Sequence, residues 1–427
     1  MEKIKIKVVD EIIYHEVLDN GLNVYIYKKE GMQKKSVYFQ TKYGSLNNEF
    51  IPAGSKNMKS FPLGIAHFLE HKLFESDDNS NIFELFEKNG AYVNASTSHD
   101  YTVYFFSCTS HFYDNLELLI NMVLSPYFTD ENVEKEKGII GQELDMYSND
   151  PNQAIFERLF YNSIINSPLK YDIGGTKEEV NKITKEDLYE CYNTFYDPSN
   201  MSLFISADEK VDKIISFVNE IMKKRSFNSI SKIVKKEYLE PKEVAKKEEV
   251  LYHNVVATKI GYAYKIILPK VSIKEEFLRR VYIRIFLSTK FGSTSLFTEK
   301  LIKEKLVKSY FYYDYTFKDN IIMIFFTGDI LDDNKVNKMI EDKLVNFDDL
   351  EDMFNLLKKN YIASYVKSFE SADAVQNSLR AMVNTYGAIL DDIYELYSNA
   401  SFDDYLRLIK SLEFKNKSKI IIKNKEK

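Results

Sequence analysis

Six histidines occur in the 427-residue chain, and two of them, His67 and His71, stand four residues apart with Glu70 between them. Four residues make slightly more than one helical turn, so on a helix both imidazoles point off one face and Glu70 lies on the same side. Two neutral imidazoles at this spacing can bind a metal ion, and a carboxylate beside them can act as a general base. The alternative is a coincidence of polar residues on an exposed helix.

A catalytic zinc site usually takes three protein ligands and leaves one position open. The best candidate for the third ligand is Glu143, which lies two helical turns after Glu136, so that both carboxylates share one face. Glu143 could bind the metal while Glu136 accepts an N–H from a ligating histidine. A solvated acidic stripe would give the same pattern. Gly138 and Gly141 each weaken this helix by up to about 1 kcal/mol, and a close approach to another backbone would explain them.

These residues need helices and strands that bring them together. The hydrophobic pattern predicts helices over 62–75 and 131–147, and a strand pair over 91–96 and 101–108. Strand pairs followed by helices recur in the second half of the chain. We therefore expect an α+β fold of two homologous domains, each a mixed, mostly antiparallel sheet with helices packed on one face.

The domain boundaries are expected where the composition changes. Between about 222 and 250 the chain is rich in Lys and Glu and has little apolar periodicity. This pattern predicts a zinc-binding catalytic domain over 1–225, a linker over 226–249, and a second domain without a metal site over 250–427.

Composition narrows the function classes. The net charge is −6 without a dense basic block, so nucleic acid is not an expected partner. No apolar run approaches the roughly 18 residues that a membrane span needs, and the N-terminus alternates like a strand and does not resemble a signal peptide. Two cysteines, Cys108 and Cys191, cannot form a disulfide framework. We expect a soluble cytoplasmic protein that does not bind membranes.

The histidine motif and its surroundings resemble one known family. The block 64–71 carries His-x-x-Glu-His, the order known as the inverzincin signature. Together with Glu143, with the strand pair over 90–104, and with Asp-Pro-Ser-Asn at 197–200, it resembles the insulinase/pitrilysin family of zinc peptidases. That family includes the mitochondrial processing peptidase. The chain looks like its half-length bacterial branch of the YmfH type, with the resemblance strong over about 20–210 and weak afterwards.

The resemblance implies a role for each residue of the motif. His67, His71 and Glu143 would hold one Zn²⁺ per chain, Glu70 would be the catalytic general base, and Glu136 would orient a ligand without binding the metal itself. Manganese or cobalt could fill the same set of ligands.

The resemblance also implies where a substrate would bind. Asn94, Ala95 and Ser96 would offer a strand edge to an extended peptide. An ordinary half-exposed strand without this role would have the same sequence pattern. Tyr310 falls at the place of a substrate-contacting tyrosine in the family's most active members. The arginine that accompanies it there is replaced by Leu306, and a nearby lysine could supply only a point charge.

These observations together predict a zinc-dependent metalloendopeptidase that hydrolyses peptides or short unfolded segments. Because family members enclose substrate between four such domains, a two-domain chain would need a partner, in a homodimer or a heterodimer with a related subunit. The alternative is a non-catalytic peptide-binding or assembly subunit, and a weaker one is a metal-dependent regulator. The intact motif argues against the non-catalytic subunit, because a scaffold does not need a general base, and zinc binding without cleavage of any peptide would favour the regulator.

Overall fold

The computed structural model describes residues 1–77, 81–225, 227 and 232–425. The chain forms two compact units, and each unit takes one segment from the other half of the sequence. The first unit consists of Met1–Leu144, Asp172–Glu237 and Tyr365–Asp392. The second consists of Asp145–Tyr171, Tyr238–Ser364 and Ile393–Lys427.

The expected domains 1–225 and 250–427 stay a prediction, because the two units are defined by packing and not by continuity along the chain. The passage from the first unit to the second between Glu237 and Tyr238 falls inside the expected linker 226–249. Residues 226 and 228–231 of that linker lie outside the described residues.

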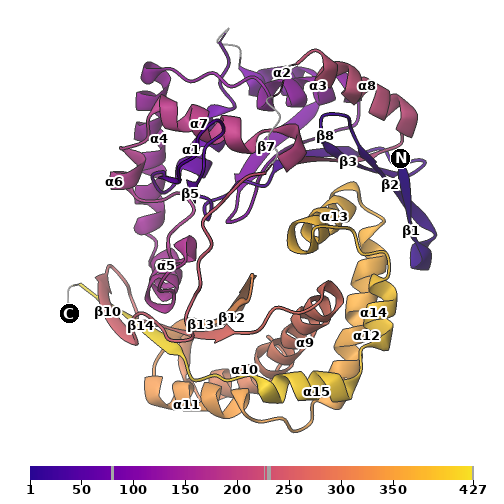
Figure 1. Ribbon diagram of the computed structural model, residues 1–427. Coiled ribbons are helices and arrows are strands. Elements are labelled where there is room, and N and C mark those ends of the chain that lie inside the picture. Colours follow the sequence, from indigo (N-terminus) through magenta and orange to yellow (C-terminus); the bar gives the residue numbers. More distant parts are fainter. Residues whose placement is uncertain (78–80, 226, 228–231, 426–427) are drawn as a thin grey trace. The chain divides into compact units, whose positions relative to one another are not determined.

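A seven-stranded sheet forms the centre of the first unit (Figure 1), in the order β1-β2-β3-β9-β4-β8-β7. The pair β3 and β9 is parallel, and the other neighbours are antiparallel. The strands are β1 (Glu2–Ile6), β2 (Glu11–Val17), β3 (Asn23–Lys28), β4 (Lys35–Thr41), β7 (Ala91–Thr97), β8 (Thr102–Cys108) and β9 (Met201–Ala207), with a separate pair β5 (Glu49–Phe50) and β6 (Lys59–Ser60).

Helices cover both faces of this sheet. Successive residues of a strand point to opposite sides, so neighbouring residues of β4 contact different layers. Val37 and Phe39 of β4 lie in the hydrophobic core with the helices shown above the sheet in Figure 1. On the other face Arg380 of α13 stacks over Tyr38. The helices are α1 (Ile65–Lys72), α2 (Ile82–Lys88), α3 (Phe112–Val123), α4 (Asp130–Ser148), α6 (Lys177–Val180), α7 (Lys185–Phe195), α8 (Val211–Lys223) and α13 (Ala372–Tyr386).

The second unit is built on a five-stranded sheet in the order β10-β14-β11-β13-β12, in which β10 and β14 are parallel. Its strands are β10 (Glu248–His253), β11 (Lys259–Ile267), β12 (Val307–Lys318), β13 (Ile321–Ile330) and β14 (Lys417–Asn424). Its helices are α5 (Pro151–Ser163), α9 (Ile273–Phe291), α10 (Leu296–Lys303), α11 (Asp333–Leu344), α12 (Glu351–Ser368), α14 (Ile393–Asn399) and α15 (Phe402–Ser411).

Two neighbouring phenylalanines of β13 show how this second sheet is covered. Phe325 contacts Phe160 of α5, whereas Phe326 contacts Phe291 of α9. Adjacent strand residues face opposite sides, so the two helices lie on opposite faces. The α+β fold with two sheet-and-helix units is therefore confirmed. Helices cover both faces of each sheet, whereas the sequence analysis expected them on one face.

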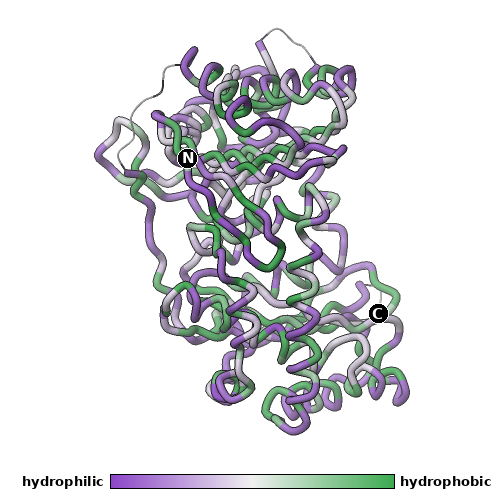
Figure 2. The backbone as a smooth tube through the Cα atoms, turned by 90° about the vertical axis from the view of Figure 1, so that its right-hand side faces the viewer, coloured by the Kyte–Doolittle hydropathy of each residue, from purple (hydrophilic) through white to green (hydrophobic). Residues whose placement is uncertain are grey.

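Local signals explain why the helices begin where they do. Asp150 caps α5 and Pro151 is its first residue, and Thr184 and Asp187 form a capping box at the start of α7. Along the helices in Figure 2 hydrophobic and hydrophilic residues alternate, as expected for helices that bury one face. None of the helices in the described part of the chain combines the length and the apolar character that crossing a bilayer requires.

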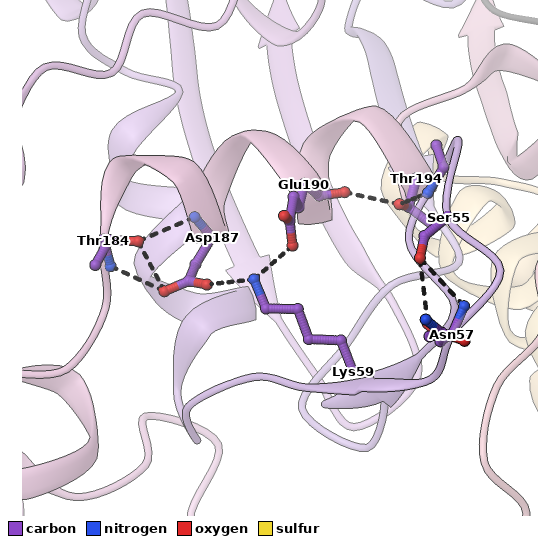
Figure 3. Close-up of polar contacts among 8 residues, drawn as sticks. Ser55, Asn57, Lys59, Thr184, Asp187, Glu190 and Thr194 are labelled. Carbon is purple, nitrogen blue, oxygen red and sulfur yellow. Dashed lines mark hydrogen bonds and ion pairs between the residues drawn. The ribbon is translucent and has the colours of Figure 1, made fainter.

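The segment before α1 is tied to α7 by a salt-bridge pair (Figure 3). Lys59 of β6 donates to Asp187 at 3.0 Å and to Glu190 at 2.6 Å, one turn apart on α7. Thr194, at the end of the same helix, accepts a hydrogen bond from the N–H of Ala53. Because α1 also packs against α7, these contacts fix the chain that leads into the histidine motif.

Several elements differ from the sequence expectation. The helix expected over 62–75 is shorter, because Gly64 adopts the left-handed conformation directly before α1. The amphipathic helix α15 and the strand β2 were not predicted. Strand β10 lies partly in the expected linker, because its first two residues, Glu248 and Glu249, continue the charged run that precedes them.

Candidate metal centre

The start of α1 is held by a close contact between two glycine-containing segments. Gly64 has φ +86°, and a Cβ there would lie 2.2 Å from the carbonyl oxygen of Gly174. Gly175 has φ +77°, and its Cβ would lie 2.5 Å from the carbonyl oxygen of Leu63. Only glycine fits at both positions, because a side chain would be strained in this conformation and would collide with main chain. The loop at 174–175 therefore fixes the helix that carries the histidine pair.

The structure brings His67, His71 and Glu143 together. The two Nε2 atoms lie 3.2 Å apart, and the Glu143 Oε2 atom lies 3.7 Å from His71 Nε2 and 3.9 Å from His67 Nε2. These three residues form a group whose potential ligand atoms all lie within 4.8 Å of one another. The arrangement is compatible with a metal site.

The separations match what a small metal ion requires. Ligand atoms about 2.0–2.2 Å from a tetrahedral zinc lie roughly 3.3–3.6 Å from one another. The three measured distances fall close to that value without any rearrangement of the backbone. The donor set of two imidazoles and one carboxylate is one of those that hold catalytic zinc with a fourth position open.

Glu136 supplies the contact that orients His71. Its Oε1 atom accepts the Nδ1–H of His71 at 2.9 Å, and only 5% of Glu136 is exposed. This bond leaves Nε2 of His71 facing His67 and Glu143. The buried Lys72 adds a second link between α1 and α4 by donating to the carbonyl oxygen of Asn132 at 3.1 Å.

His67 is held differently. Its Nδ1 atom is buried and has no hydrogen-bond partner among the described residues. Gly174 lies against the ring, since a Cβ at that position would be 3.5 Å from Nδ1 and 3.0 Å from Leu144. Packing, and not an acceptor of the kind that Glu136 offers His71, therefore sets the orientation of this imidazole.

Burial and the neighbouring charges move the pKa values of the site in different directions. Burial first, and then the charge of His71, lower the pKa of His67 to about 4, against the opposing effect of Glu143 and Glu136. Burial also lowers the pKa of His71, but the hydrogen bond and charge of Glu136 outweigh it and the net shift is upward. A neutral His67 at pH 7 is the form that binds a metal.

Glu70 is buried beside the cluster. Burial raises the pKa of its carboxyl group, while a hydrogen bond from Thr97 and the charge of His71 act in the opposite direction. The Thr97 hydroxyl donates to Oε2 of Glu70 at 2.6 Å. The side chain is therefore held in place and partly shielded from water, as a general base requires.

The predicted substrate strand is the outermost strand of its sheet. In β7, Asn94 and Ser96 are exposed and Ala95 is half-buried. Asn94 donates to the Tyr92 hydroxyl at 2.9 Å and accepts from the N–H of Ala95 at 2.8 Å. The strand has the open edge that peptide addition needs, and its role in binding stays a prediction.

Tyr310 lies in the second unit, on β12. Its hydroxyl donates to Oδ1 of Asn152 at 3.1 Å, and Lys259 lies over its ring at 4.8 Å. Leu306, at the position expected for the family's arginine, is buried. The expected contact of Tyr310 with substrate stays a prediction.

One explanation from the sequence is wrong. A close backbone approach was expected at Gly138 and Gly141 in α4, but nothing lies within 4 Å of a Cβ at Gly138, and only the side chain of Lys177 lies near Gly141. Nothing in the structure explains these two glycines. The glycines that do permit a close approach are Gly64 and Gly175, and the adjacent pair at 174–175 was the available signal.

Thr97 was also missed by the sequence analysis. It follows directly on the three residues assigned to substrate binding, but a threonine in a strand carries no sign of a contact with a helix 27 positions earlier. Its role depends on the tertiary packing of β7 against α1.

The fold and the site together define a two-unit α+β protein with a two-histidine, one-carboxylate cluster beside a buried glutamate. Two family models match the sequence: insulinase (peptidase family M16) over residues 48–177, and the peptidase M16 inactive domain over residues 182–355. The chain belongs to the insulinase family of peptidases, peptidase family M16.

Individual relatives agree with this assignment. The uncharacterized zinc protease YmfH of Bacillus subtilis is 36% identical over 379 residues, which cover 88% of each chain. The crystal structure of an M16-like peptidase from Alicyclobacillus acidocaldarius superposes with a TM-score of 0.88 at 28% identity, covering 96% of this chain and 97% of that one. The mitochondrial-processing peptidase subunit beta of Caenorhabditis elegans is 29% identical over 175 residues, which are 40% of this chain and 38% of that protein.

Proposed function

We propose that the chain is a zinc-dependent metalloendopeptidase that hydrolyses peptides or short unfolded segments. The observation that carries the proposal is that the potential ligand atoms of His67, His71 and Glu143 lie within 4.8 Å of one another. The buried Glu70 lies on α1, the helix that carries both histidines. A purely structural site would need the ligands but would gain nothing from a buried carboxylate next to them. The names of relatives as zinc proteases support the same activity.

In this proposal Nε2 of both histidines and the Glu143 carboxylate bind zinc, and Glu136 keeps the His71 ring in place. When bound, zinc supplies a Lewis acid that polarises a peptide carbonyl and makes water more acidic. Glu70 accepts the proton of the attacking water at its carboxylate and passes it to the leaving amine. Its raised pKa suits a group that must both take up and release a proton.

The substrate peptide is proposed to add to the open edge of β7, beside Asn94, Ala95 and Ser96. Main-chain hydrogen bonds along such an edge give affinity without demanding one particular side-chain sequence. This mode selects extended segments, so folded proteins are excluded as substrates. Tyr310 is proposed as a further substrate contact.

We further propose that the chain acts in the cytoplasm as a homodimer or with a related two-domain subunit. The relative named as a subunit of the mitochondrial-processing peptidase supports a paired arrangement. The two cysteines, Cys108 and Cys191, are unpaired and buried, which suits a reducing compartment.

The test compares the wild type with Glu70→Gln in zinc content and in cleavage of a quenched fluorescent peptide library. We expect about one zinc per chain in both proteins, and a loss of about 10²–10⁴-fold in the cleavage rate of the variant. Glu87→Gln is the matched control, since it removes the same charge from an exposed position on α2. Cleavage by Glu70→Gln at the wild-type rate would contradict the proposal, and zinc binding without any cleavage would favour a peptide-binding subunit.

A further inference from the structure

Thr97 connects two parts of the proposed active site. It is the last residue of β7, and its hydroxyl donates to Oε2 of Glu70 at 2.6 Å. This is the length of a strong hydrogen bond between a hydroxyl and a carboxylate. Glu70 is 9% exposed, so no shell of bulk water competes for its oxygens and the contact fixes the carboxylate.

The hairpin that carries Thr97 is itself fixed. Thr97 stands opposite Thr102 in the β7–β8 pair, and the Thr102 hydroxyl donates to the carbonyl oxygen of Tyr43 at 2.9 Å. At the turn, a Cβ on Gly44 would lie 2.4 Å from the carbonyl oxygen of Ser98, so the two main chains are in direct contact. Thr97 therefore has little freedom to move away from Glu70.

The main chain of Thr97 belongs to the open edge of the sheet. The N–H of Ser98 donates to the carbonyl oxygen of Tyr101 at 2.8 Å, so Ser98 and Tyr101 form a hydrogen-bonded pair. Such pairs alternate along antiparallel strands, so Thr97 and Ala95 turn their main-chain groups away from β8 and toward the outer side. Thr97 thus lies on the edge where a peptide would add, while its hydroxyl donates to Glu70 and its main-chain N–H also acts on the Glu70 carboxyl group.

We propose that Thr97 is a positioning residue that sets the Glu70 carboxylate for proton transfer and links it to the peptide-binding edge of β7. The inference rests on the proposed peptidase function. Loss of the hydroxyl lets the carboxylate rotate, and a displacement of about 1 Å at a catalytic group can lower a rate about 100-fold. Because the hydrogen bonds of the Thr97 side chain run to Glu70 and Thr102, and not to the three proposed zinc ligands, we expect metal affinity to stay unchanged.

Kinetics of three variants test the proposal. Thr97→Val keeps the shape and removes the hydroxyl, and we expect kcat to fall about 10–100-fold with KM within threefold and the zinc content unchanged. Thr97→Ser restores the hydroxyl and should recover most of kcat. Thr41→Val is the control, because the Thr41 hydroxyl also donates at 2.6 Å but to the main-chain carbonyl of Phe195. A kcat in Thr97→Val equal to that of the wild type would overturn the proposal.

A structural measurement separates failure of this inference from failure of the proposed function. If the wild type cleaves no peptide, the peptidase proposal fails, yet crystal structures of the zinc-loaded wild type, Thr97→Val and Thr97→Ser still decide the role of Thr97. We expect the Glu70 carboxylate to move by about 1 Å or more in Thr97→Val and to stay in place in Thr97→Ser. An unmoved carboxylate in Thr97→Val would overturn the inference whatever the activity.

Discussion

Replacing Glu136 by Gln tests whether its carboxylate tunes the metal centre through His71. Glutamine can still accept the Nδ1–H of His71 across the 2.9 Å contact, but without the negative charge. A buried hydrogen bond to a charged group contributes about 1.5–3 kcal/mol, and one between neutral groups about 0.5–1.5 kcal/mol. The difference of about 1–1.5 kcal/mol corresponds to roughly 5–15-fold weaker zinc binding. This range reaches the lower end of the roughly 10–100-fold effect that is general for groups that orient a metal ligand.

The assay is competition for zinc against a chromophoric chelator at pH 7. Glu134→Gln is the control, since it removes the same charge from the same helix at a side chain that is 70% exposed and pairs with Lys137. Zinc affinity of Glu136→Gln within twofold of the wild type would refute the reasoning. An equal loss in Glu134→Gln would show that general charge, and not the hydrogen bond to His71, is responsible.

Two further predictions concern the stability of each unit. Gly64→Ala should lower the Tm by about 5 °C or more and weaken zinc binding, because its Cβ would meet the Gly174 carbonyl at 2.2 Å. Gly31→Ala is the control, since Gly31 also has a positive φ of +78° but nothing lies within 4 Å of its Cβ, and its Tm should fall much less. Equal falls in Tm would contradict the role of the contact. The hydrogen bonds from Arg158 lower the pKa of Glu249 from 4.5 to about 2, so the stability they add is present above pH 4.5 and is lost as the pH falls toward 2. Glu249→Gln should therefore unfold at a lower temperature than the wild type at pH 6, with a difference that shrinks below pH 4.5, and a constant difference from pH 6 to pH 3 would contradict this.

The site was predictable where its geometry is local. The positions of His67 and His71 on one face follow from their spacing, and so does the common face of Glu136 and Glu143. That these two helices meet could be expected from the family resemblance and not from the spacing. The contacts of Thr97 and of the loop at 174–175 could not be predicted, because they join segments that are distant in the sequence.

The fold shows the same limit. Strand and helix patterns predicted the α+β class, since alternation and helical periodicity are properties of short segments. Short-segment patterns could not predict that Asp145–Tyr171 packs in the second unit and Tyr365–Asp392 in the first. The helices α5 and α13 carry ordinary amphipathic patterns, and nothing in a pattern says which sheet a helix covers. The helix α15 was missed although its pattern was readable from the sequence.

The most direct test of the central claim is X-ray absorption at the zinc K-edge, on the wild-type chain loaded with one equivalent of zinc. The account predicts two imidazole nitrogens and carboxylate oxygen at about 2.0–2.2 Å, with no sulfur ligand. The spectrum of His67→Ala should lose one imidazole contribution. A sulfur neighbour at about 2.3 Å, or a spectrum unchanged in His67→Ala, would contradict the metal centre described above.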